Sequence, residues 1–243
     1  MNDAKLIVAL DLETFQEARQ LIDELADTVD IFKVGSQTIT SYGQEIIRYL
    51  QARGKKVFLD LKFHDIPNTV ALAVKNAVSL SIPHQGQNSW APLFMMTVHT
   101  VGGKEMLEAA VRAGESQAKA LGVFRPLIVG VTVLTSDAPG INLENVVLER
   151  ARLAKESGLD GVVASAQETA AIRRALGNDF LIVTPGIRPS ESSPKGSGDD
   201  QKRVATPARA VANGSNFLVV GRPIILSPSP RAAALRILED MKK

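Results

Sequence analysis

Short apolar runs rich in β-branched residues alternate along the chain with segments whose apolar positions recur every three to four residues. The runs predict strands and the segments predict helices, because side chains share a face every second residue in a strand and about every 3.6 residues in a helix. The expected strands cover residues 6–11, 31–35, 57–62, 94–99, 126–134, 161–165, 180–187 and 216–222.

Residues that typically begin and end helices occur between these strands. Thr14 with Glu17, and Ser165 with Glu168, have the spacing of a capping box, in which side chain and backbone bond reciprocally across three residues. Further helix starts and stops are indicated by Thr206-Pro207, Ser229-Pro230, Gly54, Gly158, Gly177 and Gly214.

Eight alternations of strand and helix favour an α/β fold of the (β/α)8 TIM barrel type, as a single domain covering residues 1–243. An open doubly wound sheet is the alternative, although such sheets usually have fewer strands. The longest polar stretch, residues 189–202, precedes more strand and helix pattern of the same kind. We therefore interpret it as a loop within the domain.

Composition narrows the class of protein. The 243 residues are 45% hydrophobic, enough for a large core, and the net charge of +2 is too small to indicate nucleic acid as a partner. The chain has no cysteine, which excludes disulfides and thiolate chemistry. No stretch approaches the roughly 20 apolar residues of a membrane span. The expectation is a soluble cytoplasmic protein without a membrane partner.

Polar and charged residues gather where the predicted strands end. In a (β/α)8 barrel the loops after the strands form the active site, so side chains at these positions should meet at one mouth of the barrel. A purely structural distribution would scatter them between both ends. The residues concerned are Asp11, Lys33, Asp60, Lys62, His99, Thr135, Arg188 and Arg222.

Carboxylates and ammonium groups alternate within this set. Asp60 and Lys62 are two residues apart on one predicted strand and should project together, with Asp65 just beyond it. With Asp11 and Lys33 they would form an array in which each charge favours the charged form of its neighbour. Taken singly, Asp11 and Lys33 could equally be solvated strand ends.

Glycine and arginine follow both of the last two predicted strands. TIM barrels often bind phosphate at these two loops, where glycine admits close backbone approach and arginine offers a planar fork of donors. One Gly-Arg pair alone would be weak support. Gly186 with Arg188, and Gly221 with Arg222, together predict a phosphate site.

The segment 190–201 adjoins Arg188 and is rich in Ser, Gly and Asp. It is either an unspecialised surface loop or a lid that closes over a bound phosphate and excludes water. In the second case Gln201 would contact the ligand.

The three histidines do not indicate a metal site. His64, His84 and His99 lack the His-x-His or His-x-Asp spacing that would favour metal binding, so no metal is expected. His99, at the end of the fourth predicted strand, is either a hydrogen-bonding residue behind the site or a satisfied strand end.

Several motifs in order resemble the orotidine 5′-phosphate decarboxylase family over nearly the whole chain. The Asp-x-Lys-x-x-Asp core, from Asp60 to Asp65, is shared with a wider group of phosphosugar decarboxylases and synthases. The full ten-residue string from Asp60 to Thr69 is highly specific for the family. The motifs are Ala9-Leu10-Asp11, Phe32-Lys33-Val34-Gly35, Asp60-Leu61-Lys62-Phe63-His64-Asp65-Ile66-Pro67-Asn68-Thr69, Val131-Thr132-Val133-Leu134-Thr135, Thr184-Pro185-Gly186-Ile187-Arg188-Pro189 and Val220-Gly221-Arg222-Pro223.

The resemblance implies a barrel homodimer that converts orotidine 5′-monophosphate to UMP and CO₂ without metal or organic cofactor, in pyrimidine biosynthesis. It implies that Lys62 donates a proton to C6 beside Asp60, and that Asp65 and Thr69 reach into the partner subunit's site. The other implied substrate contacts are Asp11 and Lys33 at the ribose, Thr135 at the pyrimidine, Arg188, Gln201, Gly221 and Arg222 at the phosphate, and Ile66.

One stretch departs from the family pattern. Residues 81–93 resemble an insertion before the fourth strand, where Trp90 would pack on the face away from the active site, and the departure leaves the partner of Thr97 open. The alternatives in function are another phosphosugar decarboxylase or synthase of the same barrel type, and a nucleotide-binding protein without turnover. The first would need a metal site, and the second would be expected to lack Lys62 or Asp60.

Overall fold

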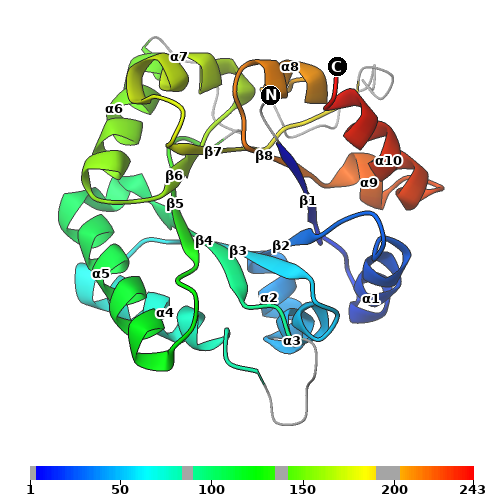
Figure 1. Ribbon diagram of the computed structural model, residues 1–243, viewed down its shortest axis with the longest axis horizontal. Helices are drawn as coiled ribbons and strands as arrows, with labels where there is room; N and C mark the ends of the chain where they lie inside the picture. Colours follow the sequence, from blue (N-terminus) through cyan, green and yellow to red (C-terminus); the bar gives the residue numbers. More distant parts are fainter. Residues whose placement is uncertain (1–3, 84–89, 135–141, 190–202) are drawn as a thin grey trace.

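The computed structural model describes residues 4–83, 90–134, 142–189 and 203–243. Eight parallel strands close into a barrel in sequence order, β1 to β8, which confirms the expected fold (Figure 1). The strands are β1 Lys5–Ala9, β2 Ile31–Gly35, β3 Lys56–Phe63, β4 Leu93–His99, β5 Leu127–Val131, β6 Gly161–Val163, β7 Leu181–Thr184 and β8 Phe217–Val220.

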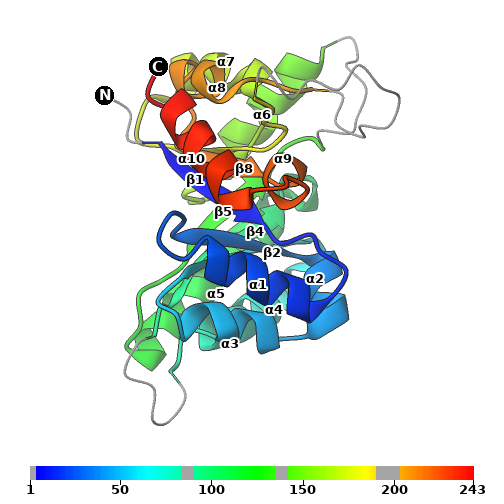
Figure 2. The same cartoon turned by 90° about the vertical axis from the view of Figure 1, so that its right-hand side faces the viewer.

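Helices form a ring outside the barrel, and Figure 2 shows the same ring from the side. Within the described residues they are α1 Phe15–Glu24, α2 Ser36–Tyr42, α3 Glu45–Gln51, α4 Pro67–Ser79, α5 Gly103–Leu121, α6 Leu143–Glu156, α7 Ala166–Leu176, α8 Pro207–Ala212, α9 Arg222–Ile225 and α10 Pro230–Asp240, with the short 3₁₀ helix η1 Thr100–Gly102. None of these helices is both long enough and apolar enough to cross a bilayer.

Alternation along the strands divides the core into two layers. Ile7 and Phe58 belong to the cluster that fills the barrel, whereas their neighbours Val8 and Leu59 belong to the larger cluster between sheet and helices. Both faces of each strand are therefore buried, as expected for a parallel sheet covered by helices.

The predicted helix ends are largely confirmed. Thr14 and Glu17 form the full capping box at α1, and Thr206 caps α8 ahead of Pro207. Ser165 caps α7 by accepting from the N–H of Gln167, at 3.3 Å, one residue earlier than a capping box would require. That second capping box was therefore wrong in detail, because Glu168 is engaged in an ion pair with Arg203.

Several strands end earlier than predicted. β5 stops at Val131 and β7 stops at Thr184, although the apolar pattern continues beyond both. Pro185 has no N–H to donate and Gly186 has a φ of 74°, so the backbone leaves the sheet there. The continuing apolar residues enter the loops at the barrel mouth.

The stretch predicted as an insertion lies ahead of β4, as expected. Its residues 84–89 fall outside the described part of the chain. Among its described residues Trp90 is half-buried and donates its indole N–H to the carbonyl of Ser81 at 3.1 Å. Ser81 also accepts the N–H of Leu93 at 3.1 Å, so the two ends of the stretch are joined at the start of β4.

Candidate active site

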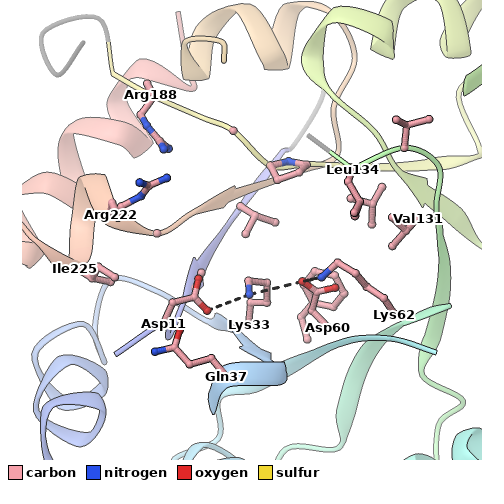
Figure 3. Close-up of a pocket in the computed structure, with 18 residues that line it drawn as sticks. Asp11, Lys33, Gln37, Asp60, Lys62, Val131, Leu134, Arg188, Arg222 and Ile225 are labelled. Carbon is pink, nitrogen blue, oxygen red and sulfur yellow. Dashed lines mark hydrogen bonds and ion pairs between the residues drawn. The ribbon is translucent and has the colours of Figure 1, made fainter. Parts of the chain in front are cut away.

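A cavity of about 590 Å³ opens at the carboxyl ends of the strands (Figure 3). Its apolar lining includes residues of the cluster that fills the barrel, and its charged residues come from β2, β3, the loops after β1 and β7, and the start of α9. The lining residues are Ala9, Asp11, Lys33, Gln37, Phe58, Asp60, Lys62, Val131, Val133, Leu134, Val163, Pro185, Gly186, Arg188, Val219, Gly221, Arg222 and Ile225.

Four of the predicted charged residues form a continuous chain of ion pairs across this cavity. Lys33 Nζ lies 3.3 Å from Oδ1 of Asp11 and 3.6 Å from Oδ2 of Asp60. Lys62 Nζ lies 2.9 Å from the same Oδ2 of Asp60. The order Asp11, Lys33, Asp60, Lys62 can be followed in Figure 3, and charges alternate in sign along it.

Asp60 is the least exposed carboxylate of the chain of ion pairs. Its side chain is 12% exposed, against 43% for Asp11. Burial alone would raise the pKa of Asp60, but the ammonium groups of Lys33 and Lys62 and the hydroxyl of Thr97 outweigh burial and lower that pKa. Asp60 is therefore ionised at neutral pH and holds two ammonium groups beside it.

The backbone at Lys62 is unusual. Its φ is 50°, in the left-handed region that residues other than glycine rarely adopt. The Lys62 N–H donates to Oγ1 of Thr97 at 2.8 Å, and the Thr97 hydroxyl donates to Oδ1 of Asp60 at 3.1 Å. Thr97 was noted from the sequence only as a residue whose partner was open, and the structure supplies both partners.

Helix α2 fixes the loop that carries Asp11. The Thr38 hydroxyl donates to the carbonyl of Leu10 at 2.7 Å, and the Tyr42 hydroxyl donates to the carbonyl of Leu12 at 2.6 Å. Asp11 is thus held from both sides. Gln37, on the first turn of α2, lines the cavity and was missed from the sequence, where its place just after the second strand was the available signal.

Two arginines face the opposite end of the cavity from Lys62 (Figure 3). Arg188 follows β7 and Arg222 follows β8, as predicted, and Gly186 and Gly221 line the cavity beside them. The N–H of Arg188 donates to the carbonyl of Ala205 at 2.9 Å, so the loop after β7 is paired with the chain ahead of α8. Two guanidinium groups and the backbone at glycine suit a phosphate group.

Other predicted site residues lie elsewhere. Asp65, Ile66 and Thr69 are exposed around the start of α4 and do not line the cavity, and Ile66 is 66% exposed. Thr135, Gln201 and the segment 190–201, expected as a lid, lie outside the described residues. The site built by the described residues therefore contains the charged array and the two arginines.

Neither His64 nor His99, the two histidines that the structure describes, lines the cavity. His99 ends β4, and its Nδ1 accepts the N–H of Val101 at 3.3 Å, which makes it the cap of η1. Its ring centroid lies 5.8 Å from that of His64. Among residues 4–83, 90–134, 142–189 and 203–243, no three His, Cys, Asp or Glu side chains cluster as a metal site would require.

Comparisons with known proteins agree with this geometry. The model of the orotidine 5′-phosphate decarboxylase / HUMPS family matches residues 4–237. A protein of Syntrophotalea carbinolica named orotidine 5′-phosphate decarboxylase is 45% identical over 245 residues, covering 98% of this chain and 94% of that protein. One of Vibrio cholerae serotype O1 with the same name is 44% identical, covering 99% and 98%.

Solved structures show the same relationship. The crystal structure of orotidine 5′-phosphate decarboxylase from Lactobacillus acidophilus matches with a TM-score of 0.80 and 34% identity, covering 99% of this chain and 100% of that one. An uncharacterised conserved protein from Geobacillus kaustophilus matches with a TM-score of 0.79 and 33% identity, covering 97% and 99%. This chain therefore belongs to the orotidine 5′-phosphate decarboxylase / HUMPS family.

Proposed function

We propose that this protein decarboxylates orotidine 5′-monophosphate to UMP and CO₂ without a metal or organic cofactor, as a step of pyrimidine biosynthesis. The observation that carries the proposal is the placement of Lys62 and Asp60 at one end of a cavity whose other end holds Arg188 and Arg222. A substrate with a carboxylate at one end and a phosphate at the other matches this distribution of charge. The cytoplasmic location expected from the sequence stays a prediction.

Lys62 is the proposed proton donor. When the bond between C6 and the carboxylate breaks, the electron pair stays on C6 in the plane of the ring, where the π system does not delocalise it. An ammonium group fixed beside C6 stabilises this charge and then transfers one proton to the carbon. The products are CO₂, UMP and a neutral lysine, which regains its proton from solvent.

Asp60 holds that ammonium group in place, and Lys33 holds Asp60. The Asp60 carboxylate contacts Lys62 Nζ at 2.9 Å, and Lys33 Nζ approaches the same oxygen at 3.6 Å. Because the array is organised before the substrate arrives, little reorganisation is needed at the moment of reaction. This fixed electrostatic arrangement is the main way in which the described residues would lower the activation barrier of decarboxylation.

The remaining contacts hold the ends of the substrate. The phosphate would be bound by Arg188, Arg222, Gln201 and the backbone at Gly221, as the family resemblance implies. The ribose would be bound by Lys33 and Asp11. Thr135 would meet the pyrimidine. Binding energy gained at the phosphate, far from C6, can then offset the cost of ordering the reacting centre.

We further propose that the active protein is a homodimer in which Asp65 and Thr69 complete the partner subunit's site. Both residues are exposed and lie outside their own subunit's cavity. Exposed apolar side chains accompany them, with Ile66 66%, Leu72 52% and Val101 51% exposed. Apolar residues exposed on α4 and η1 are the kind of surface that a second subunit would cover.

Turnover by purified, chelator-treated protein tests the proposed function. Loss of orotidine 5′-monophosphate is followed by absorbance, and UMP is identified by chromatography. The expected result is stoichiometric UMP that does not increase when divalent metal is added. Absence of UMP from folded protein would refute the proposal, and so would turnover that appears only with metal. The second result would favour a metal-dependent enzyme of the same barrel type.

A further inference from the structure

The pairing of β3 with β4 is interrupted at Asp60, the first residue of the ten-residue motif that ends at Thr69. Leu59 pairs with Met96 and Phe63 pairs with Val98, so residues 60–62 of β3 face the single residue Thr97 of β4. The surplus forms a bulge, which bends a strand and redirects its side chains. Asp60 and Lys62 both belong to this bulge.

The side chain of Thr97 bridges the irregular part of the pairing. Thr97 is completely buried, and its Oγ1 accepts the Lys62 N–H at 2.8 Å while its hydroxyl donates to Asp60 Oδ1 at 3.1 Å. Lys62 Nζ in turn donates to Asp60 Oδ2 at 2.9 Å. These three hydrogen bonds close a ring that joins the backbone of Lys62, its own ammonium group and the carboxylate between them.

We propose that Thr97 is a positioning residue for decarboxylation, which holds Lys62 in its left-handed conformation and sets the orientation of the Asp60 carboxylate. The inference rests on the proposed roles of these two residues. Thr97 does not line the cavity and so acts through them. A hydroxyl suits this place because it accepts one hydrogen bond and donates another at the same atom.

At the bulge, the hydrogen bonds of Thr97 matter more than the volume of its side chain. A left-handed residue other than glycine is strained and persists only where its surroundings hold it. Valine at position 97 would preserve volume but could neither accept from Lys62 nor donate to Asp60. The ammonium group would then sample several positions, and a misplacement of about 1 Å at a reacting centre costs on the order of 10²-fold in rate.

Two pairs of variants test the inference. Thr97→Val and Thr97→Ser compare removal with retention of the hydroxyl, and Thr97→Ser with Thr97→Cys differ by a single atom, oxygen against the weaker sulfur partner. Thr169→Val is the matched control, because Thr169 is also fully buried and donates its hydroxyl to the carbonyl of Ser165 at 3.1 Å on α7. Steady-state kinetics give kcat and KM, and calorimetry gives the affinity for UMP.

For Thr97→Val, kcat should fall on the order of 10²-fold with KM and UMP affinity nearly unchanged, because the phosphate contacts remain. Thr97→Ser should restore most of kcat, and Thr169→Val should keep wild-type kinetics. If Thr97→Val does not fold, a reduced kcat for Thr97→Cys relative to Thr97→Ser supports the inference.

Wild-type kcat in a folded Thr97→Val or Thr97→Cys protein would overturn the inference, as would equal losses in Thr169→Val. A wild-type protein that forms no UMP would instead refute the proposed function, so the two failures are distinct.

Discussion

Replacing Arg203 by methionine should destabilise the fold strongly, because a buried carboxylate would lose its counter-ion. Arg203 Nη1 lies 2.8 Å from Oε1 of Glu168, and the two side chains are only 1% and 6% exposed. Arg203 Nη2 also donates to the carbonyl of Leu134 at 2.9 Å. The guanidinium group thus joins α7 to the segment after β5 and to the chain that precedes α8.

The size of the loss follows from this burial. Burial raises the pKa of Glu168 above its ordinary value, and the opposing effect of Arg203 offsets only part of that rise. Removing one partner of a buried ion pair costs about 3–5 kcal/mol, a large share of the roughly 5–15 kcal/mol that stabilises most domains. For a chain of this length the Tm should fall by roughly 6–20 °C.

Urea and thermal unfolding, followed by circular dichroism, measure the effect. The comparison includes Arg203→Met, the double variant Arg203→Met with Glu168→Leu, and the control Arg112→Met. Arg112 is 67% exposed and pairs with Glu108 at 3.5 Å, so its loss should cost about 0.5 kcal/mol or less. The double variant should recover most of the stability, because neither buried charge remains.

The pH dependence of the stability lost in Arg203→Met provides a further check. A carboxyl group whose pKa is raised by folding binds its proton more tightly in the folded state, so stability rises as the pH falls through that raised pKa. The deficit of Arg203→Met should therefore shrink between neutral pH and the ordinary carboxyl range near about 4. A deficit no larger than that of Arg112→Met, or a double variant no more stable than the single one, would refute the reasoning.

Three further predictions concern the array and the dimer. Lys62→Ala should abolish turnover while UMP binding stays measurable by calorimetry. The control Lys56→Ala, at the exposed start of β3, should keep the wild-type rate. An active Lys62→Ala protein would contradict the proton-donor role. Mixed Asp65→Ala and Lys62→Ala subunits should regain about a quarter of wild-type activity, since half of randomly paired dimers have one intact site of two; no regain after verified subunit exchange would contradict the shared site. Although burial opposes it, the lysines lower the pKa of Asp60. In urea titrations, the stability that Asp60 gives relative to Asp60→Asn should therefore be constant above about pH 5 and decline as the pH falls below about 4. A stability difference that grows on acidification would exclude this linkage.

The fold was predictable because its signals repeat. Short apolar strands alternate with helices along the whole chain, so a local misjudgement does not change the topology. The largest errors in the strand bounds fall at the carboxyl ends of strands. Val133 and Leu134 extend the apolar run after β5, but they line the cavity instead of continuing the sheet.

The charged array was predictable because strand ends of a parallel barrel converge, so Asp11, Lys33, Asp60 and Lys62 had to approach one mouth. Contacts between distant polar residues were not. The pairing of Glu168 with Arg203 joins residues 35 positions apart and leaves no periodic signal in the sequence. Gln37 was missed although it follows the second predicted strand, because a glutamine at that place fits an exposed helical residue equally well.

The spacing of Asp60 and Lys62 has a physical basis that strand periodicity alone did not reveal. In a regular strand, residues two apart share a face but their Cα atoms are separated by about 6.6 Å along the strand axis. Here the bulge opposite Thr97 and the left-handed backbone of Lys62 accompany a contact of 2.9 Å between ammonium and carboxylate. β3 then ends at Phe63, so the residues from His64 onward leave the sheet and lead to α4 outside the cavity. A single irregularity in β3 thus separates the residues that serve their own subunit's cavity from those that, in the proposed dimer, serve the neighbour's.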